Sequence, residues 1–385
     1  MPSYKDLFLL DPDVVFLNHG SFGACPRPVF ETYQQWQRRL ERQPVQFLGR
    51  ELMGLLQEAR QVLAGYVHVE ANDLVYVPNA TFGVNVVARS LALGPGDEVL
   101  ATDHEYGACD RTWRFLSRQR GFAYVRQPIS LPVESAETIV EQFWQGVTER
   151  TRVIFISHIT SPTALRLPVE AIGQRARAAG ILTLIDGAHA PGQLPLDLTT
   201  LGVDFYTGNC HKWLCAPKGA GFLYAAPDRQ PLIEPLVVSW GWGEERPFTS
   251  GSDFLDYLQW QGTDDPAAYL SVPAAIQFQA EHNWPSVQEE CHQLARATMI
   301  EIGRLTGLAP LYPADSGLYR QMFTVPLPPG DVDQLKNRLY DEYRVEAPTW
   351  EWNGRPYLRV CVQGYNTTAD LETLLVGLAA VIGNW

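Results

Sequence analysis

Short apolar runs alternate with longer segments in which apolar residues recur at helical spacing along most of this chain. Runs that are rich in branched residues and bounded by polar turns are typical of buried strands in a parallel sheet. We expect such strands at residues 74–77, 98–101, 122–127, 153–156, 181–185 and 203–206. The helical pattern predicts helices within residues 28–67, 134–146 and 167–179, and one long helix from residue 267. This alternation of strands and helices is typical of an α/β fold.

Two polar residues follow neighbouring apolar runs near the middle of the chain. Residues 181–185 end at Asp186, and residues 203–206 lead into a polar turn that carries Lys212. The lysine is followed by Trp213, and a large apolar side chain is unusual next to a solvated charge. Because open α/β sheets bind ligands at the carboxyl ends of their strands, Asp186 and Lys212 are candidate site residues.

An acid and a lysine in this arrangement fit the cofactor pyridoxal phosphate (PLP). The carboxylate of Asp186 would keep the pyridine nitrogen protonated, so that the ring can accept electrons from the substrate's Cα. The amine of Lys212 would hold the aldehyde as a Schiff base and later move the Cα proton. Alternatively, Asp186 caps a helix and Lys212 makes a surface ion pair. Either residue alone favours that interpretation, whereas the pair favours PLP.

Longer motifs extend this pattern over nearly the whole chain. The segment DGAHAPG begins at Asp186 and TGNCHKWLCAPKGAGFLY at Thr207, with FLNHGSFG near the start and LRV near the end. In these motifs the chain resembles the class V aminotransferase family of fold-type I PLP enzymes, most closely its isopenicillin N epimerase branch. The resemblance implies a mostly parallel central sheet with helices on both faces, and a smaller α+β C-terminal domain. The implied divisions are an N-terminal segment over the active site (1–27), a PLP-binding domain (28–284) and the C-terminal domain (285–385).

The resemblance assigns phosphate binding to a turn between a strand and a helix. Ala80 and Thr81 stand where a predicted helix begins. The free N–H groups and the dipole of a helix N-terminus attract a phosphate there. Asn209 and His211, on either side of the cysteine before Lys212, match further phosphate ligands. The alternative for the turn is a simple helix cap.

Three more residues match cofactor-binding positions of the family. Tyr106 matches the ring that stacks on the cofactor, and its hydroxyl could exchange protons on the face opposite Lys212. His189 matches the position beside the phenolic oxygen and the Schiff-base nitrogen. Thr263 matches the residue that reaches the phosphate of a neighbouring subunit, which implies a homodimer with shared active sites. Tyr106 and His189 could instead be ordinary core residues.

The resemblance also identifies candidate contacts with an amino acid or peptide substrate. Arg359 lies in an apolar run, where it needs an anionic partner, and its forked guanidinium suits an α-carboxylate. The alternative is an internal salt bridge. Asn18, His19 and Ser21 match an N-terminal loop over the site, for which the alternative is a plain turn between a strand and a helix.

Composition excludes several other classes of function. A formal net charge of −13 over 385 residues opposes binding to nucleic acid or to an anionic membrane surface. No apolar run is long enough for a membrane span, and the start lacks the features of a signal peptide. The six cysteines lack paired spacing, so neither a metal site nor a disulfide framework is indicated. We expect a cytoplasmic protein with reduced thiols.

The residues do not separate the reactions that begin with loss of the Cα proton. Return of the proton to the other face gives epimerisation or racemisation, which the branch resemblance favours; expulsion of a group from Cβ makes the enzyme a cysteine or cystine C–S lyase. Transamination, and a non-catalytic scaffold, are further alternatives. Residues 310–329 contain no cysteine, which disfavours a desulfurase that passes on sulfur. An aromatic-rich segment, residues 231–261 with Phe248 among them, predicts a long loop over the site.

Overall fold

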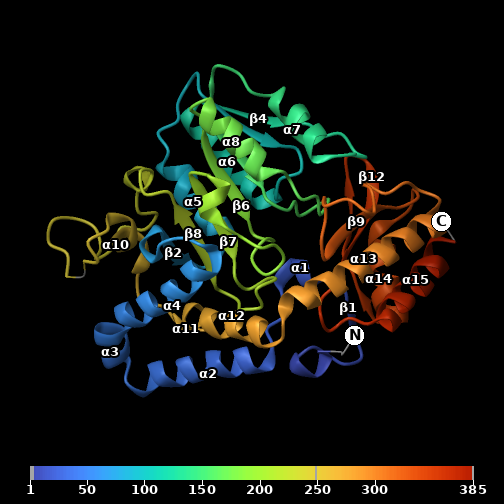
Figure 1. Cartoon of the computed structure of the whole chain (residues 1–385), viewed down its shortest axis with the longest axis horizontal. Helices are drawn as coiled ribbons and strands as arrows, with labels where there is room; N and C mark the ends of the chain where they lie inside the picture. Colours follow the sequence, from blue (N-terminus) through green and yellow to red (C-terminus); the bar gives the residue numbers. More distant parts are fainter. Residues whose placement is uncertain (1–3, 248, 384–385) are drawn as a thin grey trace.

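A seven-stranded sheet runs through the larger part of the molecule in a computed structural model that describes residues 4–247 and 249–383 (Figure 1). Its strand order is β2-β8-β7-β6-β5-β3-β4. The pairs from β7 to β4 are parallel, and β8 is antiparallel to both of its neighbours. The strands are β2 (Leu74–Val77), β3 (Glu98–Thr102), β4 (Ala123–Gln127), β5 (Thr151–Ser157), β6 (Leu182–Gly187), β7 (Phe205–Asn209) and β8 (Gly221–Ala225). The predicted mostly parallel sheet is confirmed.

Helices cover this sheet and build the remainder of the chain. They are α1 (His19–Phe22), α2 (Arg27–Arg42), α3 (Pro44–Gln46), α4 (Leu52–Val67), α5 (Ala80–Ser90), α6 (Gly107–Arg120), α7 (Ala136–Trp144), α8 (Val169–Ala178), α9 (Leu198–Leu201), α10 (Asp253–Gln259), α11 (Ala267–Leu270), α12 (Val272–Glu281), α13 (Trp284–Thr306), α14 (Val332–Tyr343) and α15 (Thr368–Ile382). Short helical segments also occur at Lys5–Leu7, Phe47–Glu51, Ala71–Asp73 and Gln230–Leu232.

The alternation of side chains along each strand divides the interior into two cores. In β3, Val99 and Ala101 belong to one apolar cluster and Leu100 to the other, because successive side chains point to opposite faces of a sheet. Helices α5, α6 and α10 contribute to the first cluster, and α4, α8 and α12 to the second. Helices therefore lie on both faces, as predicted, and the strands other than the edge strand β4 are largely buried on both sides.

The C-terminal part of the chain builds a smaller sheet of its own. Its order is β11-β12-β9, all antiparallel, formed by β9 (Met322–Pro326), β11 (Thr349–Trp352) and β12 (Arg355–Cys361). The N-terminus joins this part, since β1 (Val15–Phe16) pairs in parallel with β10 (Val345–Glu346). In Figure 1 both chain ends lie on this side of the molecule. The predicted boundaries at 27/28 and 284/285 stay a prediction.

Two predicted elements are wrong in form. The single long helix from residue 267 is three helices, α11, α12 and α13, and Asn283 between the last two has a left-handed φ of 47°. Pro273 and Pro285 stand in the first turns of α12 and α13, where a missing N–H is tolerated because those donors have no helical acceptor. The predicted loop of residues 231–261 contains α10, which is capped by Ser252.

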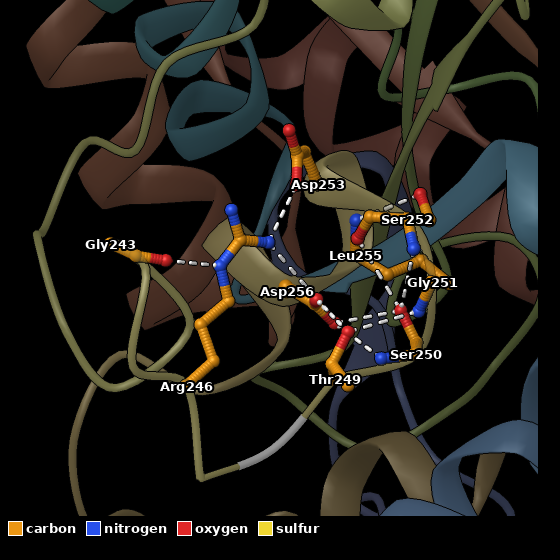
Figure 2. Close-up of polar contacts among 9 residues, drawn as sticks. All are labelled: Gly243, Arg246, Thr249, Ser250, Gly251, Ser252, Asp253, Leu255 and Asp256. Carbon is orange, nitrogen blue, oxygen red and sulfur yellow. Dashed lines mark hydrogen bonds and ion pairs between the residues drawn. The ribbon is translucent and has the colours of Figure 1, made fainter.

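A single carboxylate organises the segment before α10 (Figure 2). Asp256 accepts hydrogen bonds from Thr249 Oγ1 at 3.0 Å, from Ser250 N at 2.8 Å and from Ser250 Oγ at 2.7 Å. Arg246 lies 3.3 Å from the same carboxylate and 2.5 Å from Asp253. These contacts anchor Arg246, Thr249 and Ser250 to α10, although Trp240, earlier in the same segment, is 63% exposed. Phe248 lies outside the described residues.

Within residues 4–247 and 249–383, every helix is too short or too polar to cross a lipid bilayer.

Candidate active site

Most of the predicted cofactor-binding residues line one cavity of about 550 Å³ at the carboxyl ends of β5, β6 and β7. Parallel strands place these ends at one edge of the sheet, which is why residues far apart in the sequence meet there. The lining residues are Ser21, Phe22, Pro78, Asn79, Ala80, Thr81, Tyr106, Ala108, Ser157, Ile159, Ser161, Asp186, Ala188, His189, Asn209, His211, Lys212 and Gly219. We call it the lysine cavity.

Asp186 is a buried carboxylate in the wall of the lysine cavity. Its Oδ1 accepts the N–H of Ala188 at 2.9 Å, and its Oδ2 receives the thiol of Cys109 at 3.5 Å. Burial raises its pKa, while the Ala188 N–H and the charge of Lys212 act in the other direction. A cationic ring nitrogen beside this carboxylate would favour its charged form.

Lys212 extends into the same cavity from the turn after β7. Burial, followed by the positive charge of Arg359, lowers its pKa from 10.5 to about 8. Its Nζ lies 3.2 Å from Nε2 of His189. A lysine with such a pKa has a neutral, nucleophilic amine in a much larger fraction of molecules near physiological pH than an ordinary lysine.

Trp213 determines which nitrogen of His189 carries the proton. The indole N–H can only donate, and its Nε1 lies 3.2 Å from Nδ1 of His189. Nδ1 is therefore the acceptor, and the proton of the neutral ring is on Nε2. Burial holds the pKa of His189 well below its usual range, so the ring is neutral. Nε2–H then donates to the lone pair of the Lys212 amine.

The turn before α5 is arranged as an anion site. Asn79 caps the helix by accepting the N–H of Phe82 at 2.9 Å, and Asn209 accepts the N–H of Ala80 at 2.8 Å. The amide of Ala80 is thus engaged, and Asn209 positions the turn. Thr81 lines the lysine cavity in the first helical turn, where a backbone N–H has no helical acceptor. Its N–H and hydroxyl remain available for a phosphate.

His211 is neutral in this structure. Its Nδ1 lies 3.1 Å from the carbonyl of Ala220, so this nitrogen donates and Nε2 carries a lone pair. Burial lowers its pKa to about 4. A phosphate beside Nε2 would have to raise that pKa before the ring could donate to it.

Tyr106 lines the lysine cavity at the start of α6 and is 45% exposed. The preceding Glu105 is buried, accepts hydrogen bonds from Thr102 Oγ1 at 2.6 Å and Ser157 N at 2.8 Å, and has its pKa raised to about 7 by burial. Sequence reasoning missed Glu105, although an acid directly after a predicted strand is a usable signal. It missed the role of Trp213 as well.

Arg359, on β12, does not itself line the lysine cavity but contacts two residues that do, Ser21 and Ser161, and it has no carboxylate partner among the described residues. Its Nη1 donates to the carbonyl of Ser161 at 2.8 Å and its Nη2 to Ser21 Oγ at 2.9 Å. Its Nε is buried and has no hydrogen-bond partner among the described residues. Within residues 4–247 and 249–383, no carboxylate forms a salt bridge with Arg359, which is against the alternative interpretation of this residue. A buried guanidinium with an unused donor is suited to an incoming carboxylate.

The N-terminal loop lies partly in the wall of the lysine cavity, because Ser21 lines it and Asn18 and His19 do not. Asn18 accepts from Ser21 Oγ at 2.6 Å, and His19 is fully buried with Nε2 3.0 Å from the carbonyl of Lys212. Neither Asn18 nor His19 lines the cavity, so both are placed to position their neighbours rather than to touch a substrate. Gly23 has a φ of 70°, and a Cβ there would collide with the carbonyl of His211.

Thr263 is exposed and is not among the residues that line the lysine cavity. Its predicted contact with a neighbouring subunit stays a prediction.

These features together fit PLP. Asp186 could hold a pyridinium nitrogen, Lys212 the aldehyde, Tyr106 the ring face and Thr81 the phosphate. The buried, unpartnered Nε of Arg359 lies beside this set and is free for a substrate.

Comparison with known proteins agrees with this site. A family model described as aminotransferase class-V matches residues 23–370. The isopenicillin N epimerase of Amycolatopsis lactamdurans is 39% identical over 96% of this chain and 95% of its own length. A putative L-cysteine desulfhydrase of Oryza sativa subsp. japonica is 30% identical over 94% of this chain and 82% of its own length. The structure of a cystine C–S lyase with cysteine persulfide, at 22% identity, matches with a TM-score of 0.84 over 96% of this chain and 98% of that one, which establishes the fold.

Proposed function

From the premise that this chain belongs to the aminotransferase class-V family, we propose that it epimerises the Cα centre of an amino acid or aminoacyl peptide. Pyridoxal phosphate is its cofactor, and when bound it supplies an electron sink for the charge that develops at Cα. The observation that carries the proposal is that two groups able to exchange protons, Lys212 and Tyr106, line one cavity, and that Arg359 beside it has a buried Nε without a partner among the described residues. Inversion at carbon needs a donor and an acceptor on different faces of the substrate.

Each residue has a defined task in this proposal. Arg359 binds the substrate carboxylate through its guanidinium and orients Cα. Lys212 removes the Cα proton once its amine is free, and His189 orients the neutral amine by donating Nε2–H to it. Tyr106 returns a proton from its hydroxyl on the other face. Asp186 holds positive charge at the ring nitrogen.

The second candidate is a C–S lyase, as the desulfhydrase relative is named. It needs the same proton removal at Cα and then loss of a sulfur group from Cβ. In the described part of the chain, no cysteine lines the lysine cavity. A lyase that releases sulfur to solvent does not need a cysteine to accept it, so this absence is compatible with the second candidate. Transamination uses the same residues, and a scaffold without turnover would have no use for an amine with a lowered pKa opposite an acid.

The deciding experiment incubates the PLP-loaded protein in heavy water with L-cysteine, L-cystine and an aminoadipyl tripeptide. Mass spectrometry and chiral analysis follow deuterium at Cα, configuration and keto-acid formation. We expect deuterium with inverted configuration and no keto acid. Pyruvate with sulfide or persulfide would replace the proposal by the C–S lyase, and keto acid without released sulfur would replace it by an aminotransferase.

The variant Tyr106→Phe tests the second proton donor. We expect deuterium exchange at Cα to continue through Lys212, with inversion reduced at least about tenfold, because general acid–base groups contribute at least that much. Tyr340→Phe, an exposed tyrosine on α14, is the matched control and should invert normally. Full inversion by Tyr106→Phe would remove this residue from the role.

We also propose a cytoplasmic homodimer with shared active sites. The cysteines of the described residues are all free, which fits a reducing compartment. Thr263 and the tryptophans Trp240 and Trp242 are exposed, and exposed apolar surface of this kind is typical of an interface. Light scattering should give twice the mass of the chain, and Thr263→Ala should weaken PLP retention. A monomer of full activity would contradict the shared site.

A further inference from the structure

A second cavity, of about 610 Å³, lies behind the active site, between the first turns of α7 and α8 and residues 316–318 of the C-terminal part. It shares no lining residue with the lysine cavity. We call it the seam cavity. It is lined by residues of both the large sheet's connections and the segment before β9, so it is built only when these parts pack together.

Cationic groups in this region lack anionic partners. Arg166 lines the seam cavity, and its guanidinium has no hydrogen bond or ion pair within the described part of the chain. Burial lowers its pKa, and the next largest cause is the charge of the neighbouring Arg320. The Nε of Arg320 is itself buried without a partner among the described residues. Two adjacent guanidinium groups without a carboxylate favour an anion between or beside them.

Two further groups in the wall of the seam cavity can donate hydrogen bonds to an anion. His158 is 4% exposed and lines the seam cavity, and its Nδ1 is 3.0 Å from Tyr206 Oη. The buried hydroxyl of Tyr206 has no other acceptor among the described residues, so it donates to Nδ1 and the proton of the neutral ring is on Nε2. That Nε2–H has no partner among the described residues. Helix α8 begins at this cavity without a side-chain cap, so the N–H groups of Glu170 and Ala171 lie at a positive helix end where no side chain accepts them.

The acidic groups around the seam cavity do not cancel these donors. Asp197 is occupied with the N–H of Thr200, which it accepts at 2.9 Å. Glu134 and Glu170 are exposed, so their charges are screened by solvent. Glu170 is also close enough to Arg166 to raise its pKa, yet makes no ion pair with it.

We propose that the seam cavity binds a small molecule through an oxyanion, a carboxylate or a phosphate, held by Arg166, the Nε2–H of His158 and the first-turn N–H groups of α8. Leu167, Leu201 and Leu318 line the same cavity and offer an apolar wall to a carbon skeleton attached to that group. This inference is independent of the reaction proposed above.

A hairpin connects the seam cavity to the substrate arginine. His158 and Leu167 are joined by a hydrogen bond of 2.9 Å at its base, next to Arg166. Its tip carries Ser161, which lines the lysine cavity and accepts from Arg359 at 2.8 Å. A ligand that holds the base of this hairpin acts on the position of Arg359. We expect it to change KM for a carboxylate substrate more than kcat.

The test is isothermal titration calorimetry of the PLP-loaded full chain with inorganic phosphate and with malonate. Arg166→Gln removes the charge, and Ala171→Glu places a negative charge at the start of α8. The latter change favours the helix through its dipole, so folding is retained, while it repels an anion. Each variant should bind the preferred probe at least about tenfold more weakly than the wild type, as expected for losing a charged hydrogen bond.

Arg338→Gln, an arginine already paired with Glu342 on α14, is the matched control and should bind like the wild type. Arg166→Gln and Ala171→Glu change no residue of the lysine cavity, so an anion bound there would bind equally to every variant. Weaker binding by these two variants alone therefore identifies the seam cavity as the site. Preference for phosphate or for malonate identifies the natural oxyanion. Equal isotherms for the wild type, Arg166→Gln and Ala171→Glu, or no binding of either probe to the wild type, would overturn the proposal.

Discussion

Nε2 of His189 lies 3.2 Å from Nζ of Lys212, so the imidazole ring links this lysine to Trp213. Because Trp213 donates to Nδ1 of His189, the proton of the neutral ring is on Nε2 and points at Lys212. The lysine can accept this hydrogen bond only when its amine is neutral. The unusual Trp213 beside a lysine in the sequence thus has a chemical reason. Trp213 favours the neutral amine of Lys212 through the imidazole ring of His189, which lies between them.

Replacing Trp213 by phenylalanine should raise the pKa of Lys212. Without the indole donor, His189 is free to move its proton to Nδ1 and to accept from a lysine ammonium, which favours the charged amine. The pH midpoint for the rate of PLP uptake by the apo-protein should therefore shift upward from about 8. At neutral pH the uptake rate should fall about tenfold, as expected for a lost buried hydrogen bond.

The matched control is Trp113→Phe. Trp113 is also fully buried, but its Nε1 has no partner among the described residues, so this change removes a similar volume and no hydrogen bond. Its pH midpoint should equal that of the wild type. An equal shift in both variants would attribute the effect to packing.

The lowered pKa of Lys212 also predicts how stability depends on pH. Its pKa falls from 10.5 to about 8 on folding, so between these values the unfolded chain binds more protons than the folded chain. The contribution of Lys212 to the stability of the apo-protein therefore rises as pH increases through this window. Urea denaturation across the window should show this rise, and apo Lys212→Met should lack it. Parallel curves for the two proteins would contradict the lowered pKa.

Arg359→Lys should not preserve substrate binding, although it keeps the charge. The guanidinium contacts Ser21 and Ser161 with two nitrogens and retains Nε for the ligand, which a single ammonium cannot reproduce. We expect KM for a carboxylate substrate to increase about 10- to 100-fold. Arg355→Lys, on the same strand but exposed, should leave KM unchanged. A normal KM for Arg359→Lys would mean that charge alone is recognised.

Asp256→Asn should loosen the aromatic segment. An asparagine has one carbonyl oxygen for the hydrogen bonds that two carboxylate oxygens accept from Thr249 and Ser250. Hydrogen exchange at residues 243–247 and 249–252 should accelerate, and unfolding should require about 2 kcal/mol less. Asp253→Asn, whose side chain is 65% exposed, should change stability by less than about 1 kcal/mol. Similar exchange in both variants would show that Asp256 does not anchor the segment.

Much of the sheet and the centre of the site could be predicted from local patterns. The strand ending at Asp186 and the strand before Lys212 are buried runs, and the ends of parallel strands meet at one edge whatever the details of packing. The break of the helix after residue 267 was missed because proline is tolerated in a first turn, so Pro273 and Pro285 are compatible with either interpretation.

Sequence by itself determined the α/β architecture, the cofactor chemistry and the pair Asp186 and Lys212, because these depend on local periodicity and on residue type. Tertiary structure alone decided which atom each polar group meets: Arg359 donates to Ser21 and keeps a buried Nε without a partner among the described residues, and Trp213 directs the proton of His189. The seam cavity also exists only after distant segments pack. Hydrogen bonds depend on distances and angles between residues remote in the chain, and no local pattern encodes these.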